Sequence, residues 1–184
     1  ATGEVGEGVP LFEDVTVASR GPELSVGTRG VVLQASGGAG GFTSNSELME
    51  VHFDGTVRQV DPSWKVPFAN NSRVDLSPDG RRVLISLVDQ DGVQVSLYTK
   101  PFPTGPATLF SNLGFQSARA VWSPDGRTIA FTASVPGDSD IELIDPDGTN
   151  RRPFAASAGS EDYAAWSPDS TRIAYTVGSD VYVK

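Results

Sequence analysis

A short stretch that occurs three times constrains this chain more than any other feature of its sequence. It reads Trp-Ser-Pro-Asp-Gly-Arg-Thr-Ile-Ala-Phe over residues 122–131, and close copies cover 76–85 and 166–175. In each copy the Pro presets φ, the Asp can bond the backbone ahead of it, and the Gly (Ser170 in the last copy) completes a predicted tight turn. Alternating Ile129 and Phe131 after the turn predict a half-buried strand. Each copy therefore predicts a β-hairpin.

The spacing of these copies indicates a repeat architecture. The turn serines, Ser77, Ser123 and Ser167, are separated by 46 and 44 residues, and such periods are typical of solenoids, propellers and arrays. The third unit has four short predicted strands, at 120–123, 128–133, 141–145 and 151–155. No window has an apolar period of 3.6 residues, which excludes helical repeats. Four strands in roughly 40–45 residues predict a propeller blade.

The repeat resembles the TolB-like, WD-related β-propeller repeat. The resemblance rests on residues 122–131 and on Asp-Ile-Glu-Leu-Ile-Asp-Pro-Asp-Gly-Thr-Asn at 140–150, and it covers about residues 24–184. The same repeat is similar to those of TolB, of the gating propellers of prolyl-oligopeptidase-type peptidases and of some lyases. The resemblance therefore implies a fold without fixing a function. Its TolB branch implies an envelope scaffold with protein partners.

We expect a mobile N-terminus at 1–10 and a single all-β propeller domain, or propeller segment, at 11–184. Four blade units are expected, and the last unit lacks its outer strand: approximately 24–62, 73–111, 119–156 and 163–184. Segment 11–19 is a candidate strand that closes the ring by completing the last blade. The alternative is a partial ring, either part of a larger ring or completed by self-association.

Composition narrows the class of partner. The net charge is −9, with 14 basic against 23 acidic residues, so the clustered Lys and Arg that a phosphate backbone requires are lacking. The absence of cysteine excludes thiol catalysis, disulfides and thiolate metal sites. No apolar run approaches the length of a membrane helix. We therefore expect neither nucleic-acid binding nor membrane insertion.

A binding site is expected at the rim formed by the variable loops, opposite the tight turns, because variable loops on a repetitive scaffold usually carry specificity. Arg73, Arg119 and Tyr163 each lie four positions before a turn serine, and thus at equivalent places. Two guanidiniums there would bind the carboxylate of a peptide terminus or an acidic sugar. Alternatively, each pairs with a neighbouring acid such as Asp75 or Glu161. Aromatic candidates for a floor beneath a peptide or sugar, or for core packing, are Trp64, Phe68 and Phe115.

Residues suited to catalysis or metal binding are few. His52 is the sole histidine, and the turn serines lack the glycine pattern of a nucleophile elbow, so we predict no catalytic residues and no enzyme. Asp138, Asp140 and Asp145 are weak candidates for Ca²⁺, because their spacing differs from that of an EF-hand loop. We expect no metal and no cofactor.

We therefore predict a non-catalytic propeller that binds protein or peptide through its channel-side loops. Resemblance to TolB places it outside the cytoplasm, in a periplasm or secreted. One alternative function is an accessory or gating propeller of a prolyl-oligopeptidase-type peptidase whose catalytic domain lies elsewhere. Another is a carbohydrate-binding module that uses the aromatic residues.

Overall fold

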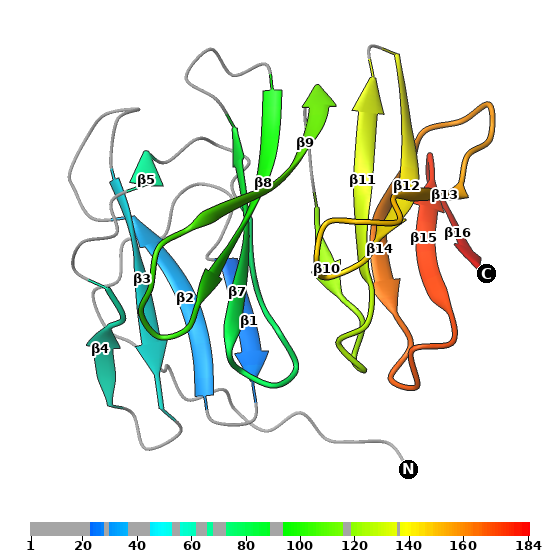
Figure 1. Ribbon diagram of the computed structural model, residues 1–184. Coiled ribbons are helices and arrows are strands. Elements are labelled where there is room, and N and C mark those ends of the chain that lie inside the picture. Colours follow the sequence, from blue (N-terminus) through cyan, green and yellow to red (C-terminus); the bar gives the residue numbers. More distant parts are fainter. Residues whose placement is uncertain are drawn as a thin grey trace.

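The described part of the chain is built entirely of antiparallel β-structure. The computed structural model describes residues 23–27, 30–36, 45–52, 56–61, 66–67, 73–88, 94–115, 119–135 and 137–184. These residues contain no helix, and therefore no helix that is long and apolar enough to cross a membrane. They form four sheets in chain order. Figure 1 shows the four sheets next to one another, coloured from blue to red.

Each of the first two sheets contains four strands paired in sequential order, and the first sheet has a fifth. The first sheet contains β1 (Glu23–Gly27), β2 (Gly30–Ser36), β3 (Asn45–Val51) and β4 (Val57–Gln59), and the short β5 (Val66–Pro67) also pairs with β3. The second sheet contains β6 (Arg73–Leu76), β7 (Arg82–Val88), β8 (Gln94–Pro101) and β9 (Thr108–Phe115).

The third sheet repeats this order, and the fourth stops one strand short. The third contains β10 (Val121–Trp122), β11 (Ile129–Val135), β12 (Asp138–Ile144) and β13 (Arg152–Ala155). The fourth contains β14 (Glu161–Trp166), β15 (Ile173–Val177) and β16 (Asp180–Val183). All four strands expected for the third unit are present, although β12 begins three residues earlier than the sequence predicted.

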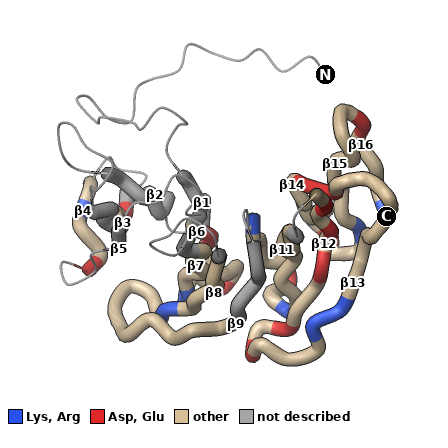
Figure 2. The backbone as a smooth tube through the Cα atoms, turned by 90° about the horizontal axis from the view of Figure 1, so that it is seen from above, with Lys and Arg blue, Asp and Glu red and all other residues tan. Residues whose placement is uncertain are grey.

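The sheets radiate from a common centre, as the blades of a propeller do. Seen from above in Figure 2, the first strands β6 and β14 lie on the inner side and the outer strands β4, β13 and β16 on the periphery. Along the inner side, β1 contacts β6, β6 contacts β10, and β10 contacts β14. The sheets are therefore related by successive rotation about one axis, which the repeat in the sequence predicted.

The three Ser-Pro-Asp turns have the same pattern of hydrogen bonds. In the third sheet the Ser123 hydroxyl donates to Asp125 Oδ1 at 2.6 Å and accepts the Thr128 amide at 2.9 Å, while Asp125 Oδ1 also accepts the Arg127 amide at 3.0 Å. The same bonds recur after Ser77 and Ser167. The predicted bond from the turn aspartate to the backbone ahead of it is confirmed, and the serine hydroxyl adds further bonds within the turn.

The third turn position explains why glycine is favoured there. Gly80, Gly126 and Ser170 have φ of 66°, 70° and 60°, in the left-handed region that costs least for glycine. Ser170 adopts this φ although it carries a side chain. Its Oγ accepts the Asp125 amide of the neighbouring sheet at 3.0 Å, a contact that a glycine cannot make.

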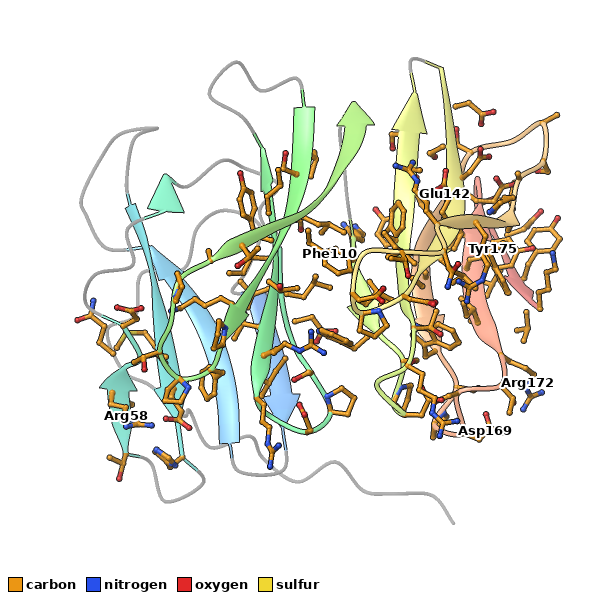
Figure 3. All side chains as sticks on the ribbon, viewed as in Figure 1. Arg58, Phe110, Glu142, Asp169, Arg172 and Tyr175 are labelled. Atoms are coloured by element: carbon orange, nitrogen blue, oxygen red, sulfur yellow. The ribbon has the colours of Figure 1, made fainter. Side chains whose placement is uncertain are left out.

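Apolar side chains pack between successive sheets rather than in one central core. Trp122, Ile129 and Phe131 of the third sheet pack against Leu84 and Leu97 of the second. On the opposite face of the third sheet, apolar residues pack against the fourth sheet; the buried members of this cluster are Ala130, Ile141, Ala155, Ala164 and Ile173. Figure 3 shows Phe110 between the second and third sheets and Tyr175 on the fourth. Trp122 is buried in the first of these clusters, and Trp166 packs against the second.

Polar contacts also join neighbouring sheets, and they differ from one boundary to the next. Between the first two sheets, the fully buried Lys100 donates to Asp61 Oδ2 at 2.7 Å. Between the second and third, Asp75 accepts the Trp122 amide at 2.8 Å, and the Arg82 guanidinium lies 5.3 Å from the Trp122 ring centre. Apolar packing is thus supplemented by bonds specific to each boundary.

Several sequence predictions fall on residues outside those described. They include the mobile N-terminus at 1–10 and the candidate closing strand at 11–19. One feature differs from expectation: the pairing of β5 with β3 was not predicted. His52 follows β3 directly, and its Nε2 lies 3.5 Å from Glu50 Oε2.

Candidate functional site

The two ends of the sheets differ in character. At one end, which we call the turn rim, lie the Ser-Pro-Asp turns; Figure 3 labels Asp169 and Arg172 there. At the other, which we call the loop rim, β11 ends, β12 begins and β14 begins. A propeller usually presents its variable loops at such an end. The predicted site residues Arg119 and Tyr163 belong to the loop rim of the third and fourth sheets.

Arg119 and Tyr163 lie in direct contact. The Arg119 guanidinium is 3.9 Å from the centre of the Tyr163 ring, a short cation–π distance. Tyr163 remains 54% exposed, and Arg119 is half-buried. Two residues that the sequence predicted at equivalent positions of neighbouring blades are therefore brought together at the loop rim.

The backbone of β14 explains why Tyr163 projects outward. Its φ is 61°, which is unusual for a residue with a large side chain, and the register of β14 with β15 shifts between Asp162 and Ala165. Such a bulge changes the direction in which side chains leave a strand. Tyr163 consequently contacts Arg119 at the rim instead of following the alternation of the strand.

Acidic side chains surround this pair. Glu161 is 1% exposed and accepts hydrogen bonds from the Ser157 amide and hydroxyl. Burial raises the pKa of Asp162, and this rise is opposed by the Arg119 charge and by the hydroxyls of Thr132 and Ser139. In Figure 2 the red segments of β12 and β14 lie side by side at this place.

Asp140, on β12, extends the acidic group. Burial raises the pKa of its carboxyl, and the nearby negative charges of Asp138 and Glu161 raise it further. Four carboxyl groups, those of Asp138, Asp140, Glu161 and Asp162, thus share this part of the loop rim with the Arg119 guanidinium.

A buried hydroxyl faces the same group. Thr132 pairs with Ile141, whose side chain packs toward the fourth sheet, so Thr132 lies between the third and fourth sheets. Thr132 is 1% exposed, and its hydroxyl lies close enough to the Asp162 carboxylate to lower the pKa of that group. We call Arg119, Thr132, Asp140, Glu161, Asp162 and Tyr163 the rim site.

The remaining predicted ligand-binding residues are not part of this group. Arg73 begins β6 and Phe115 ends β9, and their side chains are outside the described set. Trp64 and Phe68 also lie outside the described residues. The two-arginine site for a carboxylate and the aromatic floor for a sugar or peptide therefore remain predictions. Of the acids suggested as arginine partners, Asp75 accepts a hydrogen bond from the Trp122 amide.

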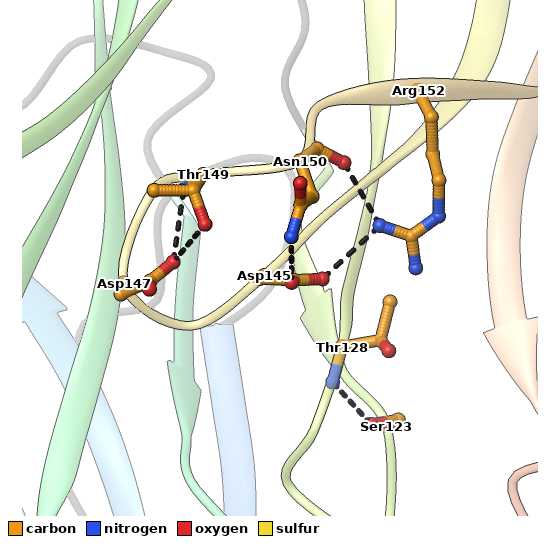
Figure 4. A network of polar contacts seen from close by, with 7 residues as sticks. All are labelled: Ser123, Thr128, Asp145, Asp147, Thr149, Asn150 and Arg152. Carbon is orange, nitrogen blue, oxygen red and sulfur yellow. Dashed lines mark hydrogen bonds and ion pairs between the residues drawn. The ribbon is translucent and has the colours of Figure 1, made fainter.

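The weak metal candidates lie at two different places. Asp138 and Asp140 are at the start of β12, whereas Asp145 follows its end. Figure 4 shows Asp145 in a turn, where it accepts bonds from Asn150 Nδ2 at 2.7 Å and Arg152 Nη1 at 3.1 Å. These contacts lower the pKa of Asp145 and satisfy it within the protein. Among the described residues, no three His, Asp or Glu side chains are grouped to hold a metal ion.

Sequence reasoning missed Thr132 and Asp162. Thr132 carries the same alternation as any strand residue, and only the packing of two sheets places it opposite an acid. Asp162 adjoins Tyr163, which was singled out, and the density of acids at 161–162 was a usable signal. The contact across sheets itself has no local signature in the sequence.

Comparison with known proteins agrees with this architecture. No protein-family model matches the chain. It is 30% identical to "Uncharacterized peptidase YuxL" of Bacillus subtilis over 101 residues, which is 51% of this chain and 13% of the relative. It is also 30% identical to "Protein TolB homolog" of Chlorobium luteolum over 139 residues, which is 73% of this chain and 30% of the relative. The chain thus spans less than a third of these curated relatives.

A solved structure extends the likeness to the fold. TolB from Acinetobacter baumannii superposes with a TM-score of 0.70 at 17% identity, covering 88% of this chain and 39% of that one. At this level of identity the match speaks for a propeller fold. Taken with the repeated Ser-Pro-Asp turn, the radiating antiparallel sheets and the TolB homologues, it makes this chain a member of the TolB-like β-propeller repeat family.

Proposed function

We propose that this chain is a non-catalytic binding segment of a propeller, which recognises a protein or peptide through its loop rim outside the cytoplasm. The observation that carries the proposal is the contact between Arg119 and the half-exposed Tyr163. Tyrosine and arginine are the residue types most enriched among the energetically dominant residues of interfaces. The location is supported by similarity to the TolB homologues.

Preorganisation of this pair supports a binding role. The bulge in β14 holds Tyr163 outward, and the Arg119 guanidinium restricts the movement of its ring. A side chain that is already ordered loses less conformational entropy when a ligand binds. A large, rigid ring at a rim of loops is therefore suited to peptide contact.

A displayed peptide library tests this function. The library is selected on the wild-type chain, and the enriched peptides are measured against Tyr163→Ala and Arg119→Ala. We expect each substitution to weaken binding by tenfold or more, the effect of losing a dominant contact. The control is Tyr182→Ala, which removes another exposed tyrosine, whose ring stacks on Tyr175 in the fourth sheet. Failure to enrich any peptide, or equal binding by Tyr163→Ala, would contradict the proposal.

A second candidate is a gating propeller of a peptidase, favoured by the peptidase relative. This function requires a catalytic domain in the same parent protein. Determining the sequence of the parent gene on both sides of this segment decides it. A catalytic hydrolase domain in the same reading frame supports the gating function, and its absence supports the binding segment.

A further inference from the structure

We propose that the outer edge of the fourth sheet is a contact surface for a second copy of this chain, in which the two β16 strands pair antiparallel. Figure 2 shows β16 on the periphery of the molecule. The contact uses the edge of a strand rather than Arg119 and Tyr163, so the inference is independent of the proposed peptide binding.

Two residues of β16 direct their backbone groups away from the sheet. Ile173 and Lys184 exchange backbone hydrogen bonds at 2.9 and 3.0 Å, and the bonded pairs of an antiparallel ladder alternate along the strand. Tyr182 therefore bonds toward β15, whereas the N–H and C=O groups of Val181 and Val183 point outward. In the third sheet the corresponding edge of β12 is covered by β13, but among the described residues no strand covers β16.

The outer strands of the other three sheets are shielded against further pairing, and β16 is not. β4 is only three residues long, the pairing of β9 with β8 contains two register shifts, and β13 contains Pro153 and pairs with a shift. Short length, bulges and proline all hinder the addition of another strand. β16 pairs with β15 without a shift, and its Val-Tyr-Val sequence consists of strong strand formers. Of the described outer strands, β16 is therefore the one suited to strand addition.

The sequence of β16 is complementary to itself when two copies run antiparallel. With Tyr182 opposite its own counterpart, Val181 of each copy lies opposite Val183 of the other. Each of these valine pairs exchanges both of its N–H···O bonds, because the valines carry the outward groups. Asp180 then lies opposite Lys184 of the second copy, so opposite charges meet at both ends of the contact.

The exposed side chains of β16 suit the same contact. Val181 and Val183 are 70% and 61% exposed and lie on one face of the strand, so the pairing shelters them together. Tyr182 is 46% exposed on the other face, where its ring stacks on Tyr175 at 5.9 Å. A non-hydrogen-bonded pair brings its side chains close, so the second Tyr182 lies beside this stack.

The charged ends favour a second copy in this orientation over other arrangements. The Lys184 ammonium donates to the Phe154 carbonyl at 2.6 Å and has further donors for Asp180 of the second copy. Two parallel β16 strands would instead place like charges next to each other, which is destabilising. The contact is short, so we expect a weak and reversible dimer.

Light scattering over a range of protein concentrations tests the contact. We expect a mass of 19.4 kDa in dilute solution that rises toward twice this value at roughly 0.1–1 mM. Val181→Lys places a charge in the paired edge and is expected to keep the chain monomeric. The matched control is Val57→Lys, which alters another exposed valine in the outer strand β4 and should dimerise as the wild type does. The amide NMR spectrum of each variant verifies that it is folded.

A charge exchange tests the orientation of the two strands. Asp180→Lys faces Lys184 of the second copy, so we expect it to weaken dimerisation several-fold. Asp180→Lys combined with Lys184→Asp restores opposite charges and should recover most of the loss. Equal weakening by the single and the double variant would overturn the antiparallel pairing.

Single-cysteine variants test the register, because the chain has no cysteine of its own. The Cα atoms of a non-hydrogen-bonded pair lie about 4.5 Å apart, a separation that a disulfide spans. In a glutathione buffer we expect Tyr182→Cys to form a covalent dimer and Thr171→Cys, in an exposed turn of the same sheet, to form none. Equal cross-linking of both variants would indicate random collision and overturn the proposal.

Other occupants of this edge give different results. A mass of 19.4 kDa at every concentration overturns the proposal. If Val181→Lys then lowers the stability of the monomer to urea and Val57→Lys does not, the edge is covered by the chain's own segment 11–19 instead of a second copy. Dimers that form equally well in Val181→Lys lie at another surface and also overturn it. None of these results bears on peptide selection by the loop rim.

Discussion

The turn aspartates show how one side chain fixes a local structure. In each Ser-Pro-Asp turn the aspartate carboxylate accepts two kinds of hydrogen bond. One comes from the serine hydroxyl two residues before it, and the other from the backbone amide two residues after it. Hydrogen bonds to the ionised form lower the pKa of Asp79, Asp125 and Asp169, and for Asp169 the value falls to about 2. The charged form of these residues is therefore part of the folded structure.

This arrangement predicts how stability depends on pH. Because the pKa of Asp169 in the folded chain is about 2, below the 3.8 of a free aspartate side chain, its carboxylate stabilises the fold above about pH 4. That contribution is lost as the pH falls toward about 2. We expect Asp169→Asn to destabilise the chain at neutral pH and to match the wild type at about pH 2, as measured by urea unfolding.

The control for this experiment is Asp180→Asn, which removes the same charge from the first residue of β16, outside the Ser-Pro-Asp turns. Its stability relative to the wild type should change less across the same pH range. A destabilisation by Asp169→Asn that persists unchanged at low pH would show that the ionised carboxylate is not the cause.

How well individual residues could be predicted depended on whether their partners are local. The serine and aspartate of each turn bond residues two to five positions away, so the sequence was sufficient to predict them. Asp162 and Thr132 are 30 positions apart in the chain and meet only because two sheets pack. The sequence predicted Arg119 and Tyr163 individually from their equal offsets, but their contact arises from the bulge in β14.

At the scale of the sheets, boundaries rather than strands carry the specific chemistry. The strands follow from alternation and turn spacing, which is why the sequence predicted the four strands of the third sheet. β5 was missed because its two residues pair with β3 some twenty positions earlier. The polar contacts across boundaries, such as Lys100 with Asp61, likewise join residues far apart in sequence.

Lys100 should contribute strongly to the boundary between the first two sheets. It is 0% exposed and donates to both Asp61 and the Gly105 carbonyl, at 2.7 and 2.5 Å. Removing one partner of a buried pair leaves the other charge desolvated, so we expect Lys100→Met to lower the free energy of unfolding by about 3 kcal/mol. Urea denaturation measures the change.

A double variant identifies the origin of this loss. Suppose that the loss of stability in Lys100→Met comes from the Asp61 carboxylate, which then stays buried without the lysine. In that case Lys100→Met combined with Asp61→Leu should be more stable than Lys100→Met alone, because no charge is left buried. If instead the two losses simply add, the ion pair does not couple the sheets.

Across the whole molecule, the third sheet is enclosed by neighbours on both faces, and the fourth is not. Ile129, Phe131 and Ile141 of the third sheet have no exposed surface, whereas all of β16 is exposed and Val181 reaches 70%. In a structure of stacked repeats, stability depends on the interfaces that each repeat makes with its neighbours. The sheets should therefore differ in local stability.

Amide hydrogen exchange tests this difference. We expect the slowest exchange at the β11 and β12 amides and the fastest, among hydrogen-bonded strand amides, in β16. Equal protection of β12 and β16 would show that the fourth sheet is stabilised by contacts that the described residues do not include. Segment 11–19, predicted to complete that sheet, would then be the first region to examine by deletion.

The different polar contacts at successive boundaries have a consequence for how such a chain can evolve or be re-engineered. Asp75 and Ser170 accept backbone amides, which any neighbour with the same backbone would offer, but the pair of Lys100 and Asp61 needs particular side chains on both sides. The contact of the Arg82 guanidinium with the Trp122 ring has the same requirement. Although the modules look interchangeable, each is therefore keyed to its own neighbour. Shuffling or duplicating one of them would preserve its internal hairpins and leave mismatched donors and acceptors at both new junctions.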